Sequence, residues 1–186
     1  IHHGVDADSF PVGDGGDYCL FLGRMGADKG PHRAIAAARQ ASMPIKLAGK
    51  LREPWEHRFF DAEIAPLLGD DVEYMGEVSH AEKVKLLGGA RATLFPIRWN
   101  EPFGLVMIES MACGTPVLAF REGAAPEVVV DGSTGYLCTD ETDMAEKLQG
   151  IGAISRSDCR AAVEGYFSRE RMVREHVEFY EEVLER

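Results

Sequence analysis

The chain of 186 residues has no long hydrophobic run, no close pair of cysteines and no excess of basic residues. Its apolar runs are far shorter than the ~18 residues that cross a membrane, so no membrane-spanning segment is expected. A formal net charge of −11 disfavours a general surface for nucleic acid or anionic membrane. No signal peptide is visible, and because the chain starts at Ile1 rather than Met we expect it to be part of a longer protein.

The spacing of the cysteines argues against disulfide bonds and against a zinc site. Cys19, Cys113, Cys138 and Cys159 include no Cys-x-x-Cys pair, and the histidines lie far from them in the sequence. We therefore expect reduced thiols and a cytoplasmic protein. A hydrophobic content of 45% with 27% charged residues is ordinary for a globular domain of this length.

Short apolar segments alternate with helical patterns along the chain. Strands are predicted at residues 18–23, 45–48, 72–75, 92–95, 117–120 and 135–138. Helices are predicted at residues 31–40, 55–68, 79–87, 104–112, 126–130 and 142–149, followed by two helices that end near Leu184. Strands separated by helices pair in parallel through right-handed crossovers, and their nearly continuous apolar character indicates helices on both faces. The sequence therefore predicts a doubly wound, six-stranded parallel α/β sheet of the Rossmann type.

Sheets of this type bind ligands at the carboxyl ends of their strands, so the loops that follow the strands are the candidate site. The loop after the first strand carries two cations, Arg24 and Lys29, but lacks the Gly-x-Gly-x-x-Gly pattern of dinucleotide-binding proteins. Both cations are able to neutralise a diphosphate. The loop alone is equally consistent with two solvated surface charges.

Two carboxylates, Glu101 and Glu109, flank the predicted start of a helix. Glu101 precedes a proline and should be extended, whereas Glu109 should lie about two turns into the helix. Between them, Gly104 allows a ligand to approach the backbone, and the amides of Gly104, Leu105 and Val106 are donors without helical partners. A helix N-terminus with two acids nearby suggests a phosphorylated, hydroxyl-rich ligand. The spacing is also compatible with two ordinary helix acids.

The ordered set of motifs resembles the group 1 (family 4) retaining glycosyltransferases. The matching segments are Glu101 to Val117 with its Glu-x7-Glu spacing, Gly23-Arg24 with Lys29-Gly30, Leu47-Ala48-Gly49, residues 123–129 and residues 132–137. Residues 1–6 look like the linker before the second domain of that family. The resemblance implies the C-terminal, donor-binding half of a GT-B fold. The expected division is a linker at 1–16, a nucleotide-sugar-binding domain at 17–165, and an amphipathic helix at 166–186 that packs back toward an N-terminal domain.

The resemblance also implies roles for individual residues. Arg24 and Lys29 would bind the donor diphosphate and stabilise its departure, Glu101 would contact the donor sugar near its reacting centre, and Glu109 would bind the ribose. Donor contacts are further expected from Gly23, Lys50, Leu51, Glu77, Val78, Phe103, Gly104, Leu105 and Val106. Catalysis would need no metal and no other cofactor. The donor would be a UDP-, GDP- or ADP-hexose, and the whole enzyme could associate peripherally with a membrane.

Two departures from the family pattern bear on the donor sugar. Ala124 stands where a second glycine is usual after Gly123, so an extra methyl group would narrow the approach to the sugar. Trp99 is bulkier than the residues often found before the first acid, and either lines the sugar pocket or serves packing. His2 and His3 are interpreted as polar groups of the linker. Two other functions remain open, a non-catalytic sugar-nucleotide-binding module and a related GT-B epimerase or phosphorylase.

Overall fold

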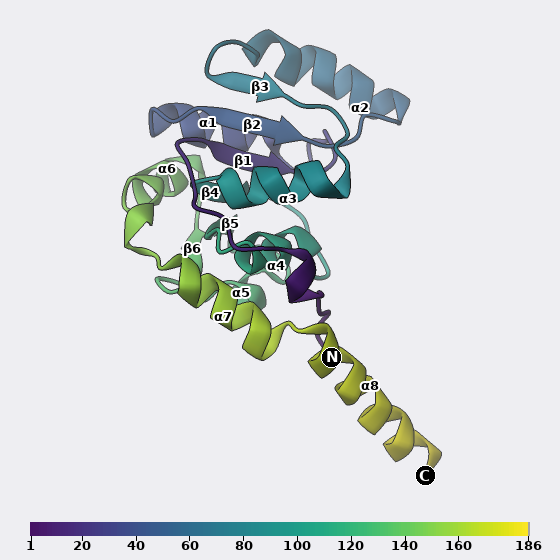
Figure 1. Cartoon of the computed structure of the whole chain (residues 1–186). Coiled ribbons are helices and arrows are strands. Elements are labelled where there is room, and N and C mark those ends of the chain that lie inside the picture. Colours follow the sequence, from purple (N-terminus) through teal and green to yellow (C-terminus); the bar gives the residue numbers. More distant parts are fainter. Residues whose placement is uncertain (186) are drawn as a thin grey trace.

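Six parallel strands form one sheet at the centre of the fold (Figure 1). The computed structural model describes residues 1–185. The strands are β1 Cys19–Leu22, β2 Ile45–Ala48, β3 Val72–Tyr74, β4 Ala92–Phe95, β5 Val117–Phe120 and β6 Gly135–Cys138. Their order is β3-β2-β1-β4-β5-β6, and every neighbouring pair is parallel. This is the strand order of a doubly wound Rossmann-like sheet, which confirms the predicted fold class.

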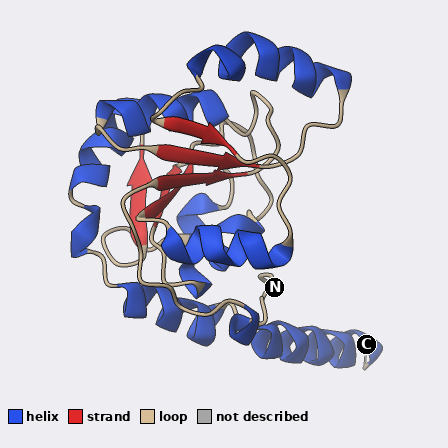
Figure 2. Ribbon diagram, turned by 45° about the horizontal axis from the view of Figure 1, so that its top comes forward, coloured by secondary structure: helices blue, strands red, loops and turns tan. Residues whose placement is uncertain are grey.

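Helices cover both faces of the sheet (Figure 2). They are α1 Pro31–Gln40, α2 Pro54–Phe59, α3 His80–Gly89, α4 Leu105–Ala112, α5 Ala125–Val128, α6 Glu141–Gln149, α7 Arg156–Tyr166 and α8 Arg169–Leu184. Shorter turns are η1 Ala7–Ser9, η2 Phe60–Ile64, η3 Ala65–Leu67 and η4 Ile151–Ala153. Helix α1 packs against α6 in one layer, and α4 contacts α3 and α7 in the other.

The segment predicted as one helix at residues 55–68 is helical from Pro54 to Leu67 but changes its type of helix along the way. The α-helical part begins at Pro54 and ends at Phe59, and the chain continues as the π-helical turn η2 and the 3-10 turn η3. Pro66 lies in η3 and is incompatible with a regular α-helix over residues 62–66, because proline has no amide to donate and its ring would collide with the carbonyl one turn earlier. The start is set by Glu56, whose Oε2 accepts the amides of Arg52 at 2.8 Å and Glu53 at 3.1 Å.

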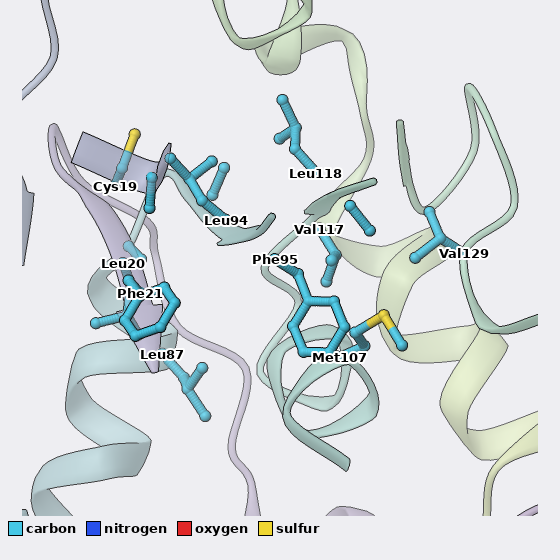
Figure 3. Packing of buried hydrophobic residues seen from close by; sticks show 14 of the residues in the cluster. Cys19, Leu20, Phe21, Leu87, Leu94, Phe95, Met107, Val117, Leu118 and Val129 are labelled. Atoms are coloured by element: carbon cyan, nitrogen blue, oxygen red, sulfur yellow. The ribbon is translucent and has the colours of Figure 1, made fainter. Parts of the chain in front are cut away.

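The hydrophobic core lies on both faces of the sheet, and Figure 3 shows the part around the central strands. Leu94 of β4 and Leu118 of β5 point to one face of the sheet, whereas Phe95 of β4 points to the other face, where Met107 of α4 and Leu87 of α3 lie. All five side chains are at most 6% exposed. Packing of this kind fixes the ends of β1, β4 and β5 relative to one another, and with them the loops of the candidate site.

The first and last segments of the chain lie together. The amide of Val5 donates to the Phe167 carbonyl at 2.9 Å, and the amide of Arg169 donates to the Val5 carbonyl at 3.0 Å. Beyond this contact α8 projects from the body, and none of its residues is fully buried (Figure 1). The boundaries at residues 16 and 165 stay predictions. Within residues 1–185, no helix combines the length and the apolar character needed to cross a membrane.

Candidate functional site

Two adjoining cavities open beside the carboxyl ends of β1 and β4. The first has a volume of about 340 Å³ and is lined by Lys29 and Glu101, among others. The second has a volume of about 350 Å³ and is lined by Arg24 and Glu109, among others. Leu22, Gly23 and Val106 line both cavities, so these form two halves of one depression.

The N-terminus of α4 lies at the wall between the two cavities. Gly104 caps this helix in the left-handed conformation, with φ 81° and ψ 67°. A Cβ there would lie 2.7 Å from the Phe95 ring and 2.8 Å from the Met107 methyl group, so glycine is required by packing as well as by conformation. The amides of Leu105 and Val106 belong to the first turn, where α-helices provide no internal acceptor. The partial positive charge of the helix end is therefore directed at the depression.

Lys29, Glu101 and Trp99 form a tight cluster at the first cavity. The Lys29 ammonium is paired with Oε2 of Glu101, and both side chains are only 16% exposed. The indole Nε1 of Trp99 donates to the same oxygen at 2.9 Å. Because both charges are largely removed from water, loss of either partner would leave a poorly solvated charge.

Arg24 is held at the edge of the second cavity by two carboxylates. It lies 3.4 Å from Oε1 of the buried Glu56 and 3.3 Å from Asp28, and its guanidinium lies 5.5 Å from the centre of the Trp55 ring. Burial raises the pKa of the Glu56 carboxyl, but the two amides of the α2 start and Arg24 more than offset this and hold the pKa below its ordinary value. Glu56 is therefore a charged partner that orients Arg24.

Two further ion pairs line the second cavity. Lys83 of α3 donates to Oε1 of Glu109 at 2.6 Å, and the side chains are 22% and 14% exposed. Lys50 lies 3.2 Å from Glu77, where a hydrogen bond from Lys50 and another from Arg52 hold the pKa of the Glu77 carboxyl below its ordinary value. The cations of the site are thus all matched with carboxylates, which explains how an acidic chain concentrates positive groups at one place.

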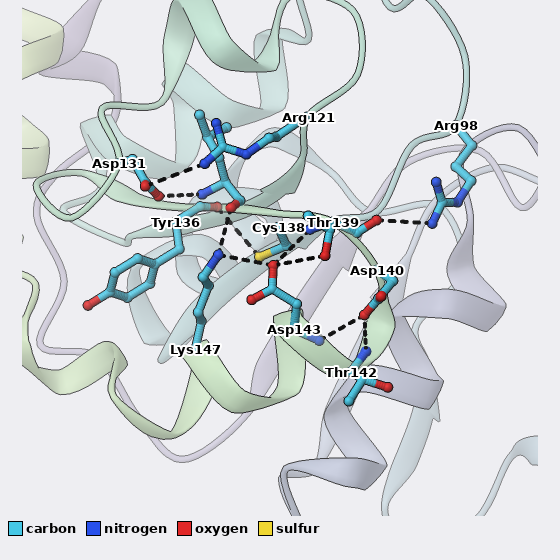
Figure 4. A network of polar contacts seen from close by, with 11 residues as sticks. Arg98, Arg121, Asp131, Tyr136, Cys138, Thr139, Asp140, Thr142, Asp143 and Lys147 are labelled. Atoms are coloured by element: carbon cyan, nitrogen blue, oxygen red, sulfur yellow. Dashed lines mark hydrogen bonds and ion pairs between the residues drawn. The ribbon is translucent and has the colours of Figure 1, made fainter.

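Contacts to the segments after β5 and β6 anchor the loop that carries Glu101. Arg98 donates to the Thr139 carbonyl at 3.3 Å, at the start of a network that continues to α6 through Asp140 and Asp143 (Figure 4). The amide of Ala124 donates to the Glu101 carbonyl at 3.0 Å. The loop after β4 is therefore tied to the segments after β5 and β6, and Glu101 is held on a fixed backbone.

The structure brings almost all predicted site residues to the two cavities. Gly23, Lys29, Glu101, Phe103, Gly104, Leu105 and Val106 line the first, and Gly23, Arg24, Lys50, Glu77, Val78, Val106 and Glu109 line the second. Leu51 is the exception, because its apolar side chain packs against the core. Glu109 lies one turn into α4 rather than two, since the helix begins at Leu105.

Among the lining residues that were not predicted as site residues, Lys83 and His3 carry side chains with polar or ionisable groups. Lys83 lies one turn into α3, the helix that follows β3. Its signal in the sequence is a cation shortly after a strand end, as for Arg24 and Lys29. His3 reaches the first cavity from the N-terminal segment, where its ring packs edge-on against Phe103 with centroids 5.1 Å apart. Its position depends on the pairing of that segment with α8, which no local pattern encodes.

Comparison with known families agrees with this arrangement. Residues 6–158 match the family model described as "Glycosyl transferases group 1". The chain belongs to this family. Its strand order and helices correspond to the C-terminal domain of a GT-B glycosyltransferase.

Several relatives are similar over most of the chain. A glycogen synthase of Mycobacterium tuberculosis is 31% identical over 174 residues, which are 84% of this chain and 38% of that enzyme. A D-inositol 3-phosphate glycosyltransferase of Thermobifida fusca is 37% identical over 134 residues, which are 63% of this chain and 30% of that enzyme. The chain thus spans about two fifths or less of the length of these relatives.

Solved structures give the same picture. AviGT4, a glycosyltransferase involved in avilamycin A biosynthesis, superposes with a TM-score of 0.87 at 28% identity, covering 99% of this chain and 57% of that one. Alr3699/HepE of Anabaena, solved with UDP and glucose, superposes with a TM-score of 0.85 at 20% identity, covering 96% of this chain and 55% of that one. The second likeness concerns the fold alone.

Proposed function

We propose that this chain is the nucleotide-sugar-binding domain of a retaining, metal-independent glycosyltransferase that transfers a hexosyl group. The observation that carries the proposal is the double cavity at the start of α4. The first cavity is lined by Lys29 and Glu101 and the second by Arg24 and Glu109, and Val106 lines both. A nucleoside diphosphate sugar matches this arrangement, because its diphosphate joins a nucleoside, which would fill one cavity, to a sugar, which would fill the other.

The diphosphate would lie against the α4 N-terminus. The first-turn amides, the helix dipole and the nearby Lys29 and Arg24 supply fixed positive charge where negative charge develops as the diphosphate departs. Because both cations are paired with carboxylates in this structure, the phosphates would compete for them rather than meet free charges. This arrangement supports stabilisation of the leaving group without a metal ion.

The nucleoside would occupy the second cavity and the sugar the first. Glu109 has a free carboxylate oxygen beside its Lys83 partner and could accept hydrogen bonds from ribose hydroxyls. Lys50, Glu77 and Val78 would surround the base. Glu101 would face the sugar, where its negative charge favours an oxocarbenium-like transition state. UDP is the first nucleotide to test, because Alr3699/HepE of Anabaena was solved with it.

The acceptor would be held by an N-terminal domain. This proposal is supported by the part of AviGT4 that the match leaves uncovered, since this chain covers 57% of AviGT4 and the remaining 43% has no counterpart in it. It is also supported by α8, on which Val173, Val177, Phe179, Tyr180, Val183 and Leu184 are each at least 49% exposed. Apolar residues exposed together in this way are typical of a surface that meets another domain.

The test is sugar transfer by the chain joined to its N-terminal part, with product configuration followed by proton NMR. We expect the donor's anomeric configuration to be kept, activity to persist in EDTA, and Lys29→Ala to lower kcat by about 10²-fold or more. Lys85→Ala, at an exposed position of α3, is the control and should retain activity. An inverted product would overturn the retaining mechanism, and loss of activity in EDTA would overturn metal independence.

A further inference from the structure

Trp99 contacts both charged groups of the first cavity. Its indole Nε1 donates to Glu101 Oε2 at 2.9 Å, and the Lys29 ammonium lies over its ring, 4.7 Å from the ring centre. The side chain lies outside the set of described residues that line this cavity. Trp99 therefore supports Lys29 and Glu101 through direct contacts with both side chains.

The backbone fixes this arrangement within three residues. The amide of Glu101 donates to the carbonyl of Trp99 at 2.8 Å, which closes a tight turn, and the Glu101 carbonyl in turn accepts the amide of Ala124. Trp99 and Glu101 thus share one anchored loop, whereas Lys29 comes from the loop after β1. Motion of Lys29 relative to the loop does not require Trp99 and Glu101 to separate.

We propose that Trp99 is a positioning residue that keeps the Glu101 carboxylate in place when Lys29 turns to the phosphates of a donor; this rests on the proposed function. Oε2 of Glu101 accepts from two donors, and a diphosphate competes for only one of them, the ammonium. The indole N–H is neutral and is a donor only, so it stays with the carboxylate. The ring face offers the ammonium an electrostatic contact beside the carboxylate.

The indole N–H of Trp99 can be observed directly, because the chain has only two tryptophans. A nitrogen–proton correlation NMR spectrum should contain two indole signals, which Trp55→Phe assigns. We expect Glu101→Gln and Lys29→Met to shift the Trp99 signal and leave that of Trp55 unchanged, since Trp55 contacts Arg24 instead. A Trp99 signal that is the same in Glu101→Gln and in the unaltered chain would overturn the proposal.

Calorimetric titrations with UDP and with UDP-glucose separate positioning from general structural damage. Phe keeps the ring face for Lys29 but removes the donor to Glu101. In Trp99→Phe we expect UDP affinity to stay within about threefold, and the affinity for UDP-glucose relative to UDP to fall about tenfold, the lower end for loss of a hydrogen bond to a charged group. Trp99→His should recover part of that ratio through its ring N–H.

The outcomes distinguish this proposal from the proposed function. Equal losses for UDP and UDP-glucose in Trp99→Phe, with no recovery in Trp99→His, would show a structural role only and overturn the proposal. Failure of the unaltered chain to bind UDP, GDP or ADP would overturn the proposed function and the role in a donor site together. The contact between Trp99 and Glu101 would then still be decided by the indole signal.

Discussion

A methyl group added at Gly123 should displace the loop that carries Glu101. Gly123 has φ +52°, and a Cβ there would lie 2.5 Å from the amide nitrogen and 2.6 Å from the carbonyl oxygen of Glu101. Both contacts are with backbone, so the loop must move. Gly132 is a matched control, because its φ of +79° imposes a similar conformational strain while a Cβ there meets nothing within 4 Å.

The magnitude follows from the difference between the two positions. Left-handed backbone costs alanine about 1 kcal/mol relative to glycine at either site. At Gly123 the steric conflict adds about 1–3 kcal/mol, which includes weakening of the hydrogen bond between Ala124 and Glu101. Gly123→Ala should therefore be about 2 kcal/mol less stable than Gly132→Ala, and its Tm about 4–8 °C lower for a domain of this size.

Thermal unfolding followed by circular dichroism gives the stability difference, and titration with UDP and UDP-glucose gives its functional consequence. We expect Gly123→Ala to bind UDP normally but to lose about tenfold in affinity for UDP-glucose, because Glu101 is moved at the sugar end. Gly132→Ala should resemble the unaltered chain in both titrations. Equal Tm values for the two variants, or equal UDP-glucose affinities, would refute the steric reasoning.

Three further predictions concern other parts of the molecule. Arg156→Met should lower the free energy of unfolding by about 3 kcal/mol in urea titrations, because Arg156 donates to four carbonyls and to the Thr115 hydroxyl. Arg174→Met, at an exposed site, is the control and should change the free energy of unfolding little. A loss below about 1 kcal/mol in Arg156→Met would contradict the prediction. Lys83→Met should weaken UDP binding about tenfold, because the Glu109 carboxylate would lose the ammonium partner that holds it beside the ribose. The exposed Lys85→Met is the control and should bind UDP normally, so equal binding by both variants would count against the account. Burial, with a smaller contribution from Arg33, lowers the pKa of His32 although Glu63 and Glu141 act in the opposite direction. The unfolded chain therefore takes up the proton first, and the free energy of unfolding should fall as pH drops below about 6.5. In His32→Gln, the free energy of unfolding from urea titrations should depend less on pH in this range, and an unchanged slope would exclude His32 as its source.

The sequence predicted the sheet well because its signals are local. Each strand is a short apolar run, and the helix after β3 is marked by the capping box of Ser79 and Glu82, which the structure contains. The strand ends then place Arg24, Lys29 and Glu101 at one edge by topology alone. The helical segment predicted at residues 55–68 is present, but no periodicity in the sequence marks its change from α-helix to η2 and η3.

The pairing of charges could not be predicted in the same way. Whether Lys83 meets Glu109 or Glu77 depends on how α3 packs beside α4, and the two helices are joined through β4 rather than adjacent in sequence. The sequence does not decide whether Trp99 lines the sugar pocket or serves packing, and it gives no sign of the hydrogen bond from Trp99 to Glu101 that the structure contains. Tertiary packing decides such contacts, and periodicity carries no information about them.

The central claim is that the double cavity binds a nucleoside diphosphate sugar without a metal ion. The most direct measurement is calorimetric titration of this chain with UDP, GDP and ADP, and then with their sugar conjugates, in EDTA. The account predicts one-to-one binding of one nucleotide, lost in Lys29→Ala and Glu109→Ala and kept in Lys85→Ala. Absence of binding by every nucleotide, or binding that survives both site variants, would contradict it.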